Sequence, residues 1–475
     1  MVFSSPTFLF LFLPVVLVGL ALVRVRRFQN LWLLAMSVMF YIWGAGGAAL
    51  ILLGVTVVSF SVGFLPWSTW KLRASPVLAR AALASAILIL LLPILLFKYL
   101  PPIAGALGSD TFASVAIPLG ISFFTFHAIS YVVDVWRGTI QPERNLRDFA
   151  LYLFVFPHQI AGPIVRYAEI RDELYGYRDS SLAQFGYGAT RFAWGLAKKV
   201  IVADQVGRLA NAIFASNAAG TELSLATAWL GALLYTVQIY FDFSGYSDMA
   251  IGLAIILGFH FPENFRQPYR SSSITEFWRR WHMTLSRWFR DYVYFPLGGN
   301  RHGVAREYAA LLTVFLLTSL WHGGTVNFLI WGGLHSAVLV VERATGLRDW
   351  QRLLLLRRVL VLVFIVVSWV PFRTGSIEDL WRYWGSMAHG SLDGLAPLAI
   401  TGLTPVLLFA LALGLVSLIG PASSTGFARI FGTRSSLELE RFRFRLAIPV
   451  AAVLVVASSV ILLWSDFSPF LYFQF

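Results

Sequence analysis

Long apolar segments alternate with short basic clusters along the whole chain. A membrane-spanning helix needs about 20 apolar residues, and in lipid the backbone must satisfy its own hydrogen bonds, which favours helices. The pattern therefore predicts an all-α polytopic membrane protein with about 12 transmembrane helices, one for each apolar segment. The segments lie near residues 6–23, 29–43, 47–65, 78–97, 114–135, 187–209, 225–258, 308–321, 326–342, 359–372, 396–419 and 446–465.

One further apolar stretch, residues 149–165, is too short and too interrupted for a simple crossing. Pro157 and Pro163 break it, and it carries His158. Irregular backbone at membrane depth is tolerated only inside protein or beside a cavity. We therefore expect a re-entrant segment here.

A second exception, residues 274–300, carries aromatic and arginine side chains at helical spacing. Phe277, Trp281 and Leu285 fall on one face, and Arg280 and Arg287 fall on another. This spacing predicts an amphipathic helix that lies at the cytoplasmic interface of the membrane.

Composition supports the membrane assignment. The 475 residues are 58% hydrophobic and 13% charged, where ordinary globular domains are about 25% charged. The chain contains no cysteine, which excludes disulfides, thiolate nucleophiles, palmitoylation and zinc–thiolate sites. No soluble domain or internal repeat is evident, so residues 1–475 are expected to form a single membrane-embedded domain.

The net charge of +13 is explained by topology without nucleic-acid binding. With one crossing per apolar segment, all the basic clusters fall on the same side, which the positive-inside rule makes the cytoplasm. Both termini then face outward, and the N-terminal segment is expected to be an uncleaved first helix. The clusters are Arg24 to Arg27, Lys71 and Arg73, Arg137 to Arg147, residues 263–307, Arg343 to Arg358 and Arg429 to Arg445.

His322 is the strongest candidate for chemistry. It follows an apolar run, residues 308–321, that covers roughly 20 Å of a hydrocarbon core about 30 Å thick. An ionisable residue at such depth usually faces a protein interior or a wet cavity. Gly323 and Gly324 directly after it can end the helix and let a substrate approach. The alternative is a histidine that only bonds between helices.

Two more histidines are open candidates. His335 lies on the returning helix and could approach the same cavity, although Gly332 and Gly333 beside it could equally mark close helix packing. His282 falls on the apolar face of residues 274–300, where it could line an internal path or be a core histidine bonded to a backbone carbonyl. For both residues the functional and the structural interpretation stay open.

Asp242 and Asp248 lie inside the long apolar segment 225–258. Buried carboxylates are costly unless they are paired, so we expect structural ion pairs rather than catalysis. The nearby arginine-rich segment, residues 263–282, either faces lipid headgroups or recognises an anionic carrier, for which the guanidinium fork of arginine suits phosphate.

A buried neutral imidazole with no thiol suits acyl transfer. The histidine can act as general base on an acceptor hydroxyl, which then attacks the carbonyl of a thioester in the same cavity. A tunnel through the fold would let donor and acceptor arrive from opposite sides of the membrane. The sequence contains no glycine-rich nucleotide loop, no HExxH and no GxSxG, and we expect no metal site.

Several long motifs resemble the membrane-bound O-acyltransferases (the MBOAT family), and its bacterial polysaccharide-acetylating branch in particular. The resemblance covers roughly residues 1–345, whereas residues 346–475 match only in hydropathy as C-terminal transmembrane helices. The motifs are FWRRWHMTLSRWFRDYVYFPLGGN, LWHGGTVNFLIWGGLH, FDFSGYSDMAIGLA, PLGISFFTFHAISYVVDVWRG and FPHQIAGPIVR.

This resemblance implies a fold with a central tunnel and a set of functional residues. His322 corresponds to the family's catalytic histidine, either as general base or as carrier of the acetyl group, and His282 and His335 match positions that recur in the branch. The expected residues of the substrate path or donor site are Trp278, Arg279, Arg280, Trp321, Asn327 and His158.

The resemblance also implies partners. Acetyl-CoA or an acyl carrier is the expected cytoplasmic donor, with no bound cofactor, and a periplasmic or membrane-anchored acetyltransferase is expected to place the acetyl group on a polysaccharide such as alginate or cellulose. The protein would then be a multi-pass component of the bacterial inner membrane, in contact with membrane lipids. One alternative is acyl transfer to peptidoglycan or teichoic acid. Another, from a different class, is a transporter or flippase of lipid-linked glycans with a histidine proton relay.

Overall fold

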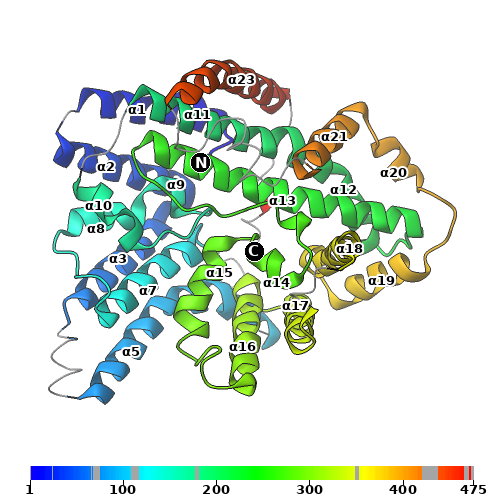
Figure 1. Ribbon diagram of the computed structural model, residues 1–475, viewed down its shortest axis with the longest axis horizontal. Coiled ribbons are helices and arrows are strands. Elements are labelled where there is room, and N and C mark those ends of the chain that lie inside the picture. Colours follow the sequence, from blue (N-terminus) through cyan, green and yellow to red (C-terminus); the bar gives the residue numbers. More distant parts are fainter. Residues whose placement is uncertain are drawn as a thin grey trace. The chain divides into compact units, whose positions relative to one another are not determined.

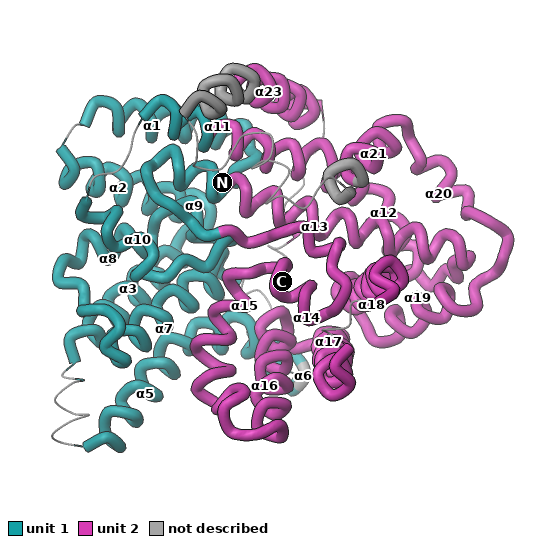
Figure 2. Tube along the Cα trace, in the orientation of Figure 1, with its two compact units in different colours: residues 1–188, 250–262 teal, residues 189–249, 263–475 magenta. Residues whose placement is uncertain are grey.

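The computed structural model describes residues 2–23, 25–65, 67, 75–108, 117–176, 181–347, 352–419, 437–464 and 470–471. Every long regular element within these ranges is a helix (Figure 1), which confirms the predicted all-α class. The chain divides into two compact units (Figure 2). Unit 1 is Met1–Gly188 with Ala250–Pro262, and unit 2 is Ala189–Met249 with Glu263–Phe475. The expected single domain stays a prediction.

Unit 1 is built around α7 (Ile121–Arg137), whose residues from Phe123 to Val135 are all buried. The helices α3 and α5 pack on α7, and α8 packs on α2. The other helices of this unit are α1 (Leu13–Leu22), α2 (Arg26–Ala45), α3 (Ala49–Gly63), α5 (Pro76–Ile94), α6 (Leu100–Ala106), α8 (Leu146–Phe154), α9 (Phe156–Gln159) and α10 (Tyr167–Tyr175).

Unit 2 contains the helices of the rest of the chain. Two helices, α11 (Leu182–Ala197) and α13 (Leu225–Ile256), belong partly to each unit. The hairpin of α16 and α17 is its most closely packed helix pair. The helices are α12 (Asp204–Ala218), α14 (Ile274–Trp278), α15 (Met283–Phe289), α16 (Val304–His322), α17 (Val326–Ala344), α18 (Leu354–Arg373), α19 (Ile377–His389), α20 (Pro397–Gly402), α21 (Pro405–Ile419) and α23 (Leu437–Trp464).

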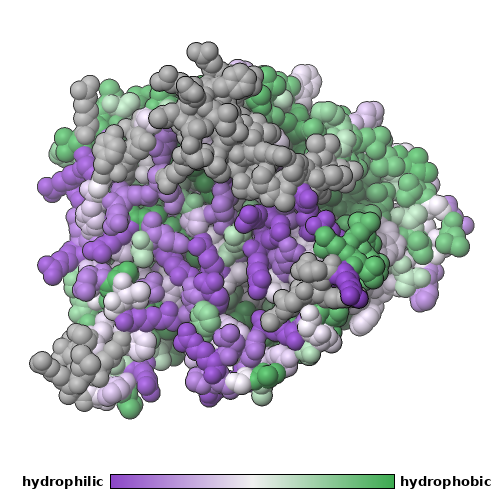
Figure 3. All heavy atoms as spheres, viewed as in Figure 1, coloured by the Kyte–Doolittle hydropathy of each residue, from purple (hydrophilic) through white to green (hydrophobic). Residues whose placement is uncertain are grey.

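The apolar segments identify the chain as a multi-pass membrane protein. Within the described residues, four continuous helical stretches are long and apolar enough to cross a membrane: residues 26–63, 76–105, 304–322 and 354–373. Shorter apolar helices cover residues 8–22, 405–414 and 448–464. Hydrophobic side chains cover the outer face over α20 and α21 (Figure 3), where Phe409 is 59% exposed. The total of about 12 crossings stays a prediction.

The expected segment boundaries agree with several helices and fail at one. The segments 225–258, 308–321 and 326–342 correspond to α13, α16 and α17. Residues 396–419 form two helices, α20 and α21, instead of one. The break falls directly before Pro405, because proline lacks a donor and disfavours a helical conformation in the residue before it.

The interrupted stretch at residues 149–165 is irregular, as expected. It contains the last residues of α8, the single turn α9 and a segment without regular secondary structure up to Val165, and residues 151–165 are buried. A re-entrant path through the membrane stays a prediction. Of the expected basic clusters, Arg24, Lys71, Arg73, Arg348 and residues 429–436 lie outside the described residues.

The prediction of one continuous amphipathic helix at residues 274–300 is wrong. The structure has α14, a turn, α15 and then a π-helical turn, Arg290–Tyr294. The break occurs at His282, whose φ of 41° is left-handed. Separate caps explain it: the Ser273 hydroxyl accepts from Glu276 N, and the Asn264 side-chain oxygen accepts from Thr284 N. The predicted apolar face is nevertheless buried.

Candidate active site

A small cavity in unit 2 brings together two of the expected histidines. Its volume is about 30 Å³, which is room for one or two water molecules. Its walls are mainly aromatic, and its polar lining residues are Asp242, His282 and His322. The remaining lining residues are Ile239, Phe243, Trp278, Trp281, Leu285, Trp331, Trp369, Phe372 and Leu471.

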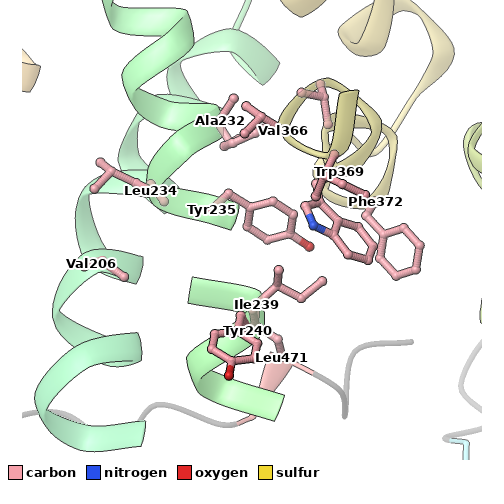
Figure 4. Close-up of a cluster of buried hydrophobic side chains, with 14 of the residues drawn as sticks. Val206, Ala232, Leu234, Tyr235, Ile239, Tyr240, Val366, Trp369, Phe372 and Leu471 are labelled. Carbon is pink, nitrogen blue, oxygen red and sulfur yellow. The ribbon is translucent and has the colours of Figure 1, made fainter. Parts of the chain in front are cut away.

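Three parts of the chain that are far apart in sequence form the apolar walls. In Figure 4, Ile239 of α13 lies opposite Trp369 and Phe372 of α18, with Leu471 below them. Leu471 belongs to the short C-terminal segment 470–471 and is 6% exposed. The segment 470–471 therefore supplies part of the wall, and no pattern in the sequence predicts this.

His322 is the last residue of α16, and Gly323 follows it as the C-cap. This agrees with the expectation that the helix ends here. The His322 ring lies 4.6 Å from the Phe372 ring and 5.4 Å from the Trp331 ring, measured between centroids. A Cβ on Gly323 would lie 2.6 Å from the Phe328 ring, so the glycine allows that ring to pack beside the histidine.

His282 is held in a defined tautomer. Its Nδ1 lies 3.0 Å from Oδ1 of Asn264, which also accepts hydrogen bonds from the backbone N and the hydroxyl of Thr284. Because Oδ1 can only accept, Nδ1 of His282 carries the proton, and Nε2 carries a lone pair. Nε2 is buried without a hydrogen-bond partner among the described residues. The imidazole therefore offers an acceptor at the cavity.

Burial sets the charge of this histidine. His282 is 2% exposed, and burial lowers its pKa to about 3 because an ion loses its hydration there. The ring is neutral near pH 7. Asn264 fixes its orientation and was missed from the sequence; the only signal was its place in the polar stretch after α13.

Asp242 reaches the cavity through a buried ion pair. Its Oδ1 lies 2.7 Å from Nζ of Lys199, and its Oδ2 accepts from the backbone N of Leu471 at 3.0 Å. Lys199 also binds Asp204 at 2.8 Å. Asp242 thus has an ion-pair partner, a lysine of the π-helical turn Lys198–Ala203. Asp242 also holds the segment 470–471 at the cavity.

Asp248 lies one to two turns further along α13 and forms a separate network. Its oxygens contact Arg191 at 2.7 Å and Lys198 at 2.6 Å, and Arg191 also contacts Glu263 at 2.6 Å. Close packing makes these contacts possible, because a Cβ on Gly195 would lie 2.5 Å from a backbone oxygen of α13. Asp248 does not line the cavity.

His335 is buried but does not line the cavity. It is 0% exposed, and its two ring nitrogens lie 3.3 Å from Nε1 of Trp278 and 3.1 Å from the hydroxyl of Ser368. Both nitrogens thus have side-chain partners. Of its two neighbouring glycines, Gly332 marks close helix packing, since a Cβ there would lie 1.9 Å from the Ser319 hydroxyl; Gly333 has open space.

A larger groove of about 390 Å³ adjoins the cavity in unit 2. Its walls come mainly from α14, α15, α16 and the π-helical turn after α15, with arginines along them. Trp278 and Leu285 line both the groove and the cavity. Among its arginines, Arg343 binds Glu307 and Arg290 binds Asp291.

The two neighbouring arginines expected at a donor site differ in their environment. Arg279 is exposed, lines the groove and has no ion pair or hydrogen bond within the described ranges. Arg280 binds Glu276 at 2.6 Å and the backbone oxygen of Arg266 at 3.3 Å, and it does not line the groove. Only Arg279 therefore presents a free guanidinium to a ligand.

The remaining expected path residues are not all at the cavity. Trp321 packs directly against His322, with ring centroids 4.4 Å apart. Asn327 instead donates to the backbone oxygens of Thr374 and Ser376, at 2.9 and 3.0 Å, which ties the start of α17 to the chain after α18. His158 lies in unit 1, stacked on Phe261 at 5.0 Å.

Metal binding finds no support in the described part of the chain, where no group of three or more histidine, aspartate or glutamate side chains could hold an ion. The polar lining of the cavity is one carboxylate, already paired with a lysine, and two imidazoles. This arrangement suits acid–base chemistry on a small reacting group.

Comparisons with known proteins point to one family. The family model described as the membrane-bound O-acyltransferase family matches residues 140–370. The "Probable alginate O-acetylase AlgI" of Pseudomonas aeruginosa is 44% identical over 82% of this chain and 75% of the relative, and that of Pseudomonas putida is 40% identical over both whole chains. A "Peptidoglycan O-acetyltransferase" of Helicobacter pylori is 32% identical over 80% of this chain and 78% of the relative. The similarity thus extends beyond residue 345.

Proposed function

The chain belongs to the membrane-bound O-acyltransferase family and is an acyltransferase, and from this premise we propose that it transfers acetyl groups from a cytoplasmic thioester for the O-acetylation of an exported polysaccharide. The observation that carries the proposal is a cavity in which His322 and a neutral His282 meet. Alginate is the first polymer to test, because alginate O-acetylases are relatives at 38–44% identity; cellulose is the second.

His322 is the catalytic residue in this proposal. The oxygen of an acceptor hydroxyl attacks the thioester carbonyl, and its proton passes to the imidazole of His322. The carbon–sulfur bond then breaks, and the same proton goes to the departing thiolate. The acceptor gains an ester, and the donor leaves as a free thiol.

His282 plays a second role in the same cavity. A pKa of about 3 makes it a weak base at neutral pH, since an efficient general base has a pKa near the working pH. Its unpartnered Nε2 instead accepts a hydrogen bond from the substrate or from a water molecule. Asn264 keeps that lone pair available by holding the proton on Nδ1.

The groove beside the cavity suits the donor. It is largely apolar and carries Arg279 at its wall, a combination that fits a thioester arm with a phosphate near its end. Acetyl-CoA is the donor we propose, with acetylated carrier protein as the alternative thioester. Arg280 supports this wall through Glu276 and is not assigned to the ligand.

The cellular setting follows the charge pattern. The protein lies in the bacterial inner membrane with its basic clusters in the cytoplasm and its termini in the periplasm. In this setting the acceptor hydroxyl that gains the ester belongs to a periplasmic or membrane-anchored acetyltransferase, which then transfers the acetyl group to a hydroxyl of the polymer.

The test uses the full chain in lipid vesicles with radiolabelled acetyl-CoA. His322→Ala should lower thioester turnover by about 10²–10⁴-fold, the usual contribution of a general base. His389→Ala is the matched control, because His389 is exposed at the end of α19. Unchanged turnover in His322→Ala would refute the catalytic assignment.

A cellular experiment tests the acceptor. The gene is expressed in a bacterium that makes alginate but has lost its own alginate O-acetylase, and ester content is measured by infrared spectroscopy and NMR. Restored acetylation of alginate supports the proposal. Acetylation found only on peptidoglycan would assign the chain to the function named for its Helicobacter relative.

A further inference from the structure

Trp278 stands between the two cavities of unit 2. It lines both the small cavity with His322 and the larger groove with Arg279, and Leu285 is its one companion in both linings. Its ring packs edge-on against Phe315 on the groove wall and Trp331 on the cavity wall, at 5.4 and 5.8 Å between centroids. A molecule that enters from the groove must pass this indole to reach His322.

A directed chain of hydrogen bonds holds the indole in place. The indole N–H can only donate, so it donates to Nδ1 of His335 at 3.3 Å. A neutral ring that accepts at Nδ1 carries its proton on Nε2, which donates to the Ser368 hydroxyl at 3.1 Å. Ser368 in turn donates to the backbone oxygen of Ile365 at 3.0 Å. Each of these side chains therefore has one donor–acceptor arrangement, and the series of hydrogen bonds ends on α18.

His335 has no access to reacting atoms. It is 0% exposed and lines neither the cavity nor the groove. Aromatic rings surround it, including Trp331 and Phe364 at 5.1 Å. Among the described residues that line the cavity or the groove, Trp278 is the one that shares a hydrogen bond with His335.

The cavity is too small for the reactants, which implies that one of its walls moves. A volume of about 30 Å³ holds one or two waters, which is too little for a thioester carbonyl together with an acceptor hydroxyl. One wall must therefore move when substrates bind. The Trp278 bond to His335 is long at 3.3 Å, and the groove offers about 390 Å³ on the indole's other side.

We propose that Trp278 is a gate between the donor groove and the catalytic cavity, and that His335, set by Ser368, is the positioning residue that keeps it closed. The inference rests on the proposed function for the direction of donor entry. While the gate is closed, water in the groove does not reach His322. The gate opens when a thioester donor bound in the groove displaces the indole. His335 moves no proton in the reaction.

Two amide substitutions separate positioning from proton transfer. His335→Asn keeps an acceptor near the place of Nδ1, and His335→Gln places its amide near Nε2 instead, so only the first retains the bond to Trp278. Neither amide can act as an acid or base near pH 7. A gate therefore predicts that the two variants differ, and proton transfer predicts that both fail equally.

The first readout is independent of the donor. The full chain in vesicles is treated with diethylpyrocarbonate, and modification of His322 is followed by peptide mass spectrometry. His335→Gln and Trp278→Phe should raise the modification rate about fivefold, the change that corresponds to one hydrogen bond, and His335→Asn should match the native chain. Rates for His389 serve as the internal reference in every sample.

The second readout is coupling. With acetyl-CoA, His335→Gln and Trp278→Phe should raise thioester hydrolysis relative to transfer, because an open gate admits water. The double variant should add little to either single change. Ser368→Ala, which removes the partner of Nε2, should act in the same direction and serves if the His335 variants do not fold.

The outcomes are distinct. Equal His322 modification in the native chain, His335→Gln and Trp278→Phe would overturn the gate, as would equal loss of transfer in both amide variants. If the native chain turns over no acetyl-CoA but the modification pattern holds, the donor assignment fails and the gate stands.

Discussion

Asn264→Ala tests whether a fixed tautomer of His282 matters for catalysis. The substitution removes an oxygen that accepts from Nδ1 of His282, from Thr284 N and from the Thr284 hydroxyl, and a nitrogen that donates to Ser247. Without the acceptor, the proton of His282 is free to move to Nε2, and the lone pair at the cavity is lost. Asn264 is 0% exposed, so water does not replace it readily.

The magnitude follows from the hydrogen bonds. One net hydrogen bond contributes about 1 kcal/mol, and a buried donor left unsatisfied costs about 1–3 kcal/mol. In the variant, the tautomer with its proton on Nδ1 has a buried unsatisfied donor, so the tautomer with its proton on Nε2 is favoured by about 1–3 kcal/mol. The competent fraction then falls about 5- to 100-fold, since 1.4 kcal/mol is tenfold in an equilibrium. We therefore expect Asn264→Ala to lower acetyl transfer by about 10-fold, with a stability loss of a few kcal/mol.

Asn264→Asp is the matched variant. Its carboxylate accepts the same hydrogen bonds, so it keeps the proton on Nδ1 and should retain more transfer than Asn264→Ala. The carboxylate also raises the pKa of His282, because a nearby anion favours the imidazolium. As the pH is lowered, the variant should therefore lose activity at a higher pH than the native chain.

The assay is acetyl transfer in vesicles, with thermal unfolding in detergent as the control for folding. Native activity in a folded Asn264→Ala protein, alongside an impaired His282→Ala protein, would refute the tautomer argument.

Three further predictions concern stability and are read from thermal unfolding in detergent. Lys199→Met should cost about 3–5 kcal/mol, because it leaves the buried carboxylate of Asp242 without its cation. Lys199→Met with Asp242→Leu should recover much of the loss, and no recovery would contradict the pairing. Gly332→Ala should destabilise the α16–α17 hairpin because its Cβ would lie 1.9 Å from a serine hydroxyl of α16, whereas Gly333→Ala meets nothing within 4 Å and should be neutral; equal effects would contradict the packing. Burial lowers the pKa of His282 from 6.5 to about 3, so between these pH values the unfolded chain binds a proton that the folded chain does not bind. The free energy of unfolding should therefore fall as the pH drops from 6.5 toward 3. His282→Gln should flatten that dependence, and an unchanged slope would contradict the assignment to His282.

The local pattern of the sequence was sufficient for the fold class, the family and the end of α16 at His322. These features depend on neighbours within a helical turn or on segment length: apolar runs of spanning length, and glycines directly after a histidine. Motif resemblance added His282 to the same site, where the structure indeed brings it beside His322.

The turn at His282 could not be read from periodicity. The apolar spacing of residues 274–300 continues across the turn, so a single helix fits it equally well. The choice was made by Asn264, 18 residues earlier in the chain, which bonds both the His282 ring and Thr284. Those contacts exist only once α13 and α15 have packed together.

The tertiary structure also decided which polar residues reach the cavity. Asp242 and Leu471 are 229 residues apart in the chain, yet both line the cavity. Lys199, 43 residues before Asp242, binds the Asp242 carboxylate without lining the cavity itself. His335, like His322, lies beside a glycine pair in an apolar segment, so the sequence does not separate their roles. In the structure, both ring nitrogens of His335 bond to Trp278 and Ser368. Hydropathy and spacing fix the order of helices in a membrane, whereas the direction of a buried side chain is set by partners that only packing brings within hydrogen-bond distance.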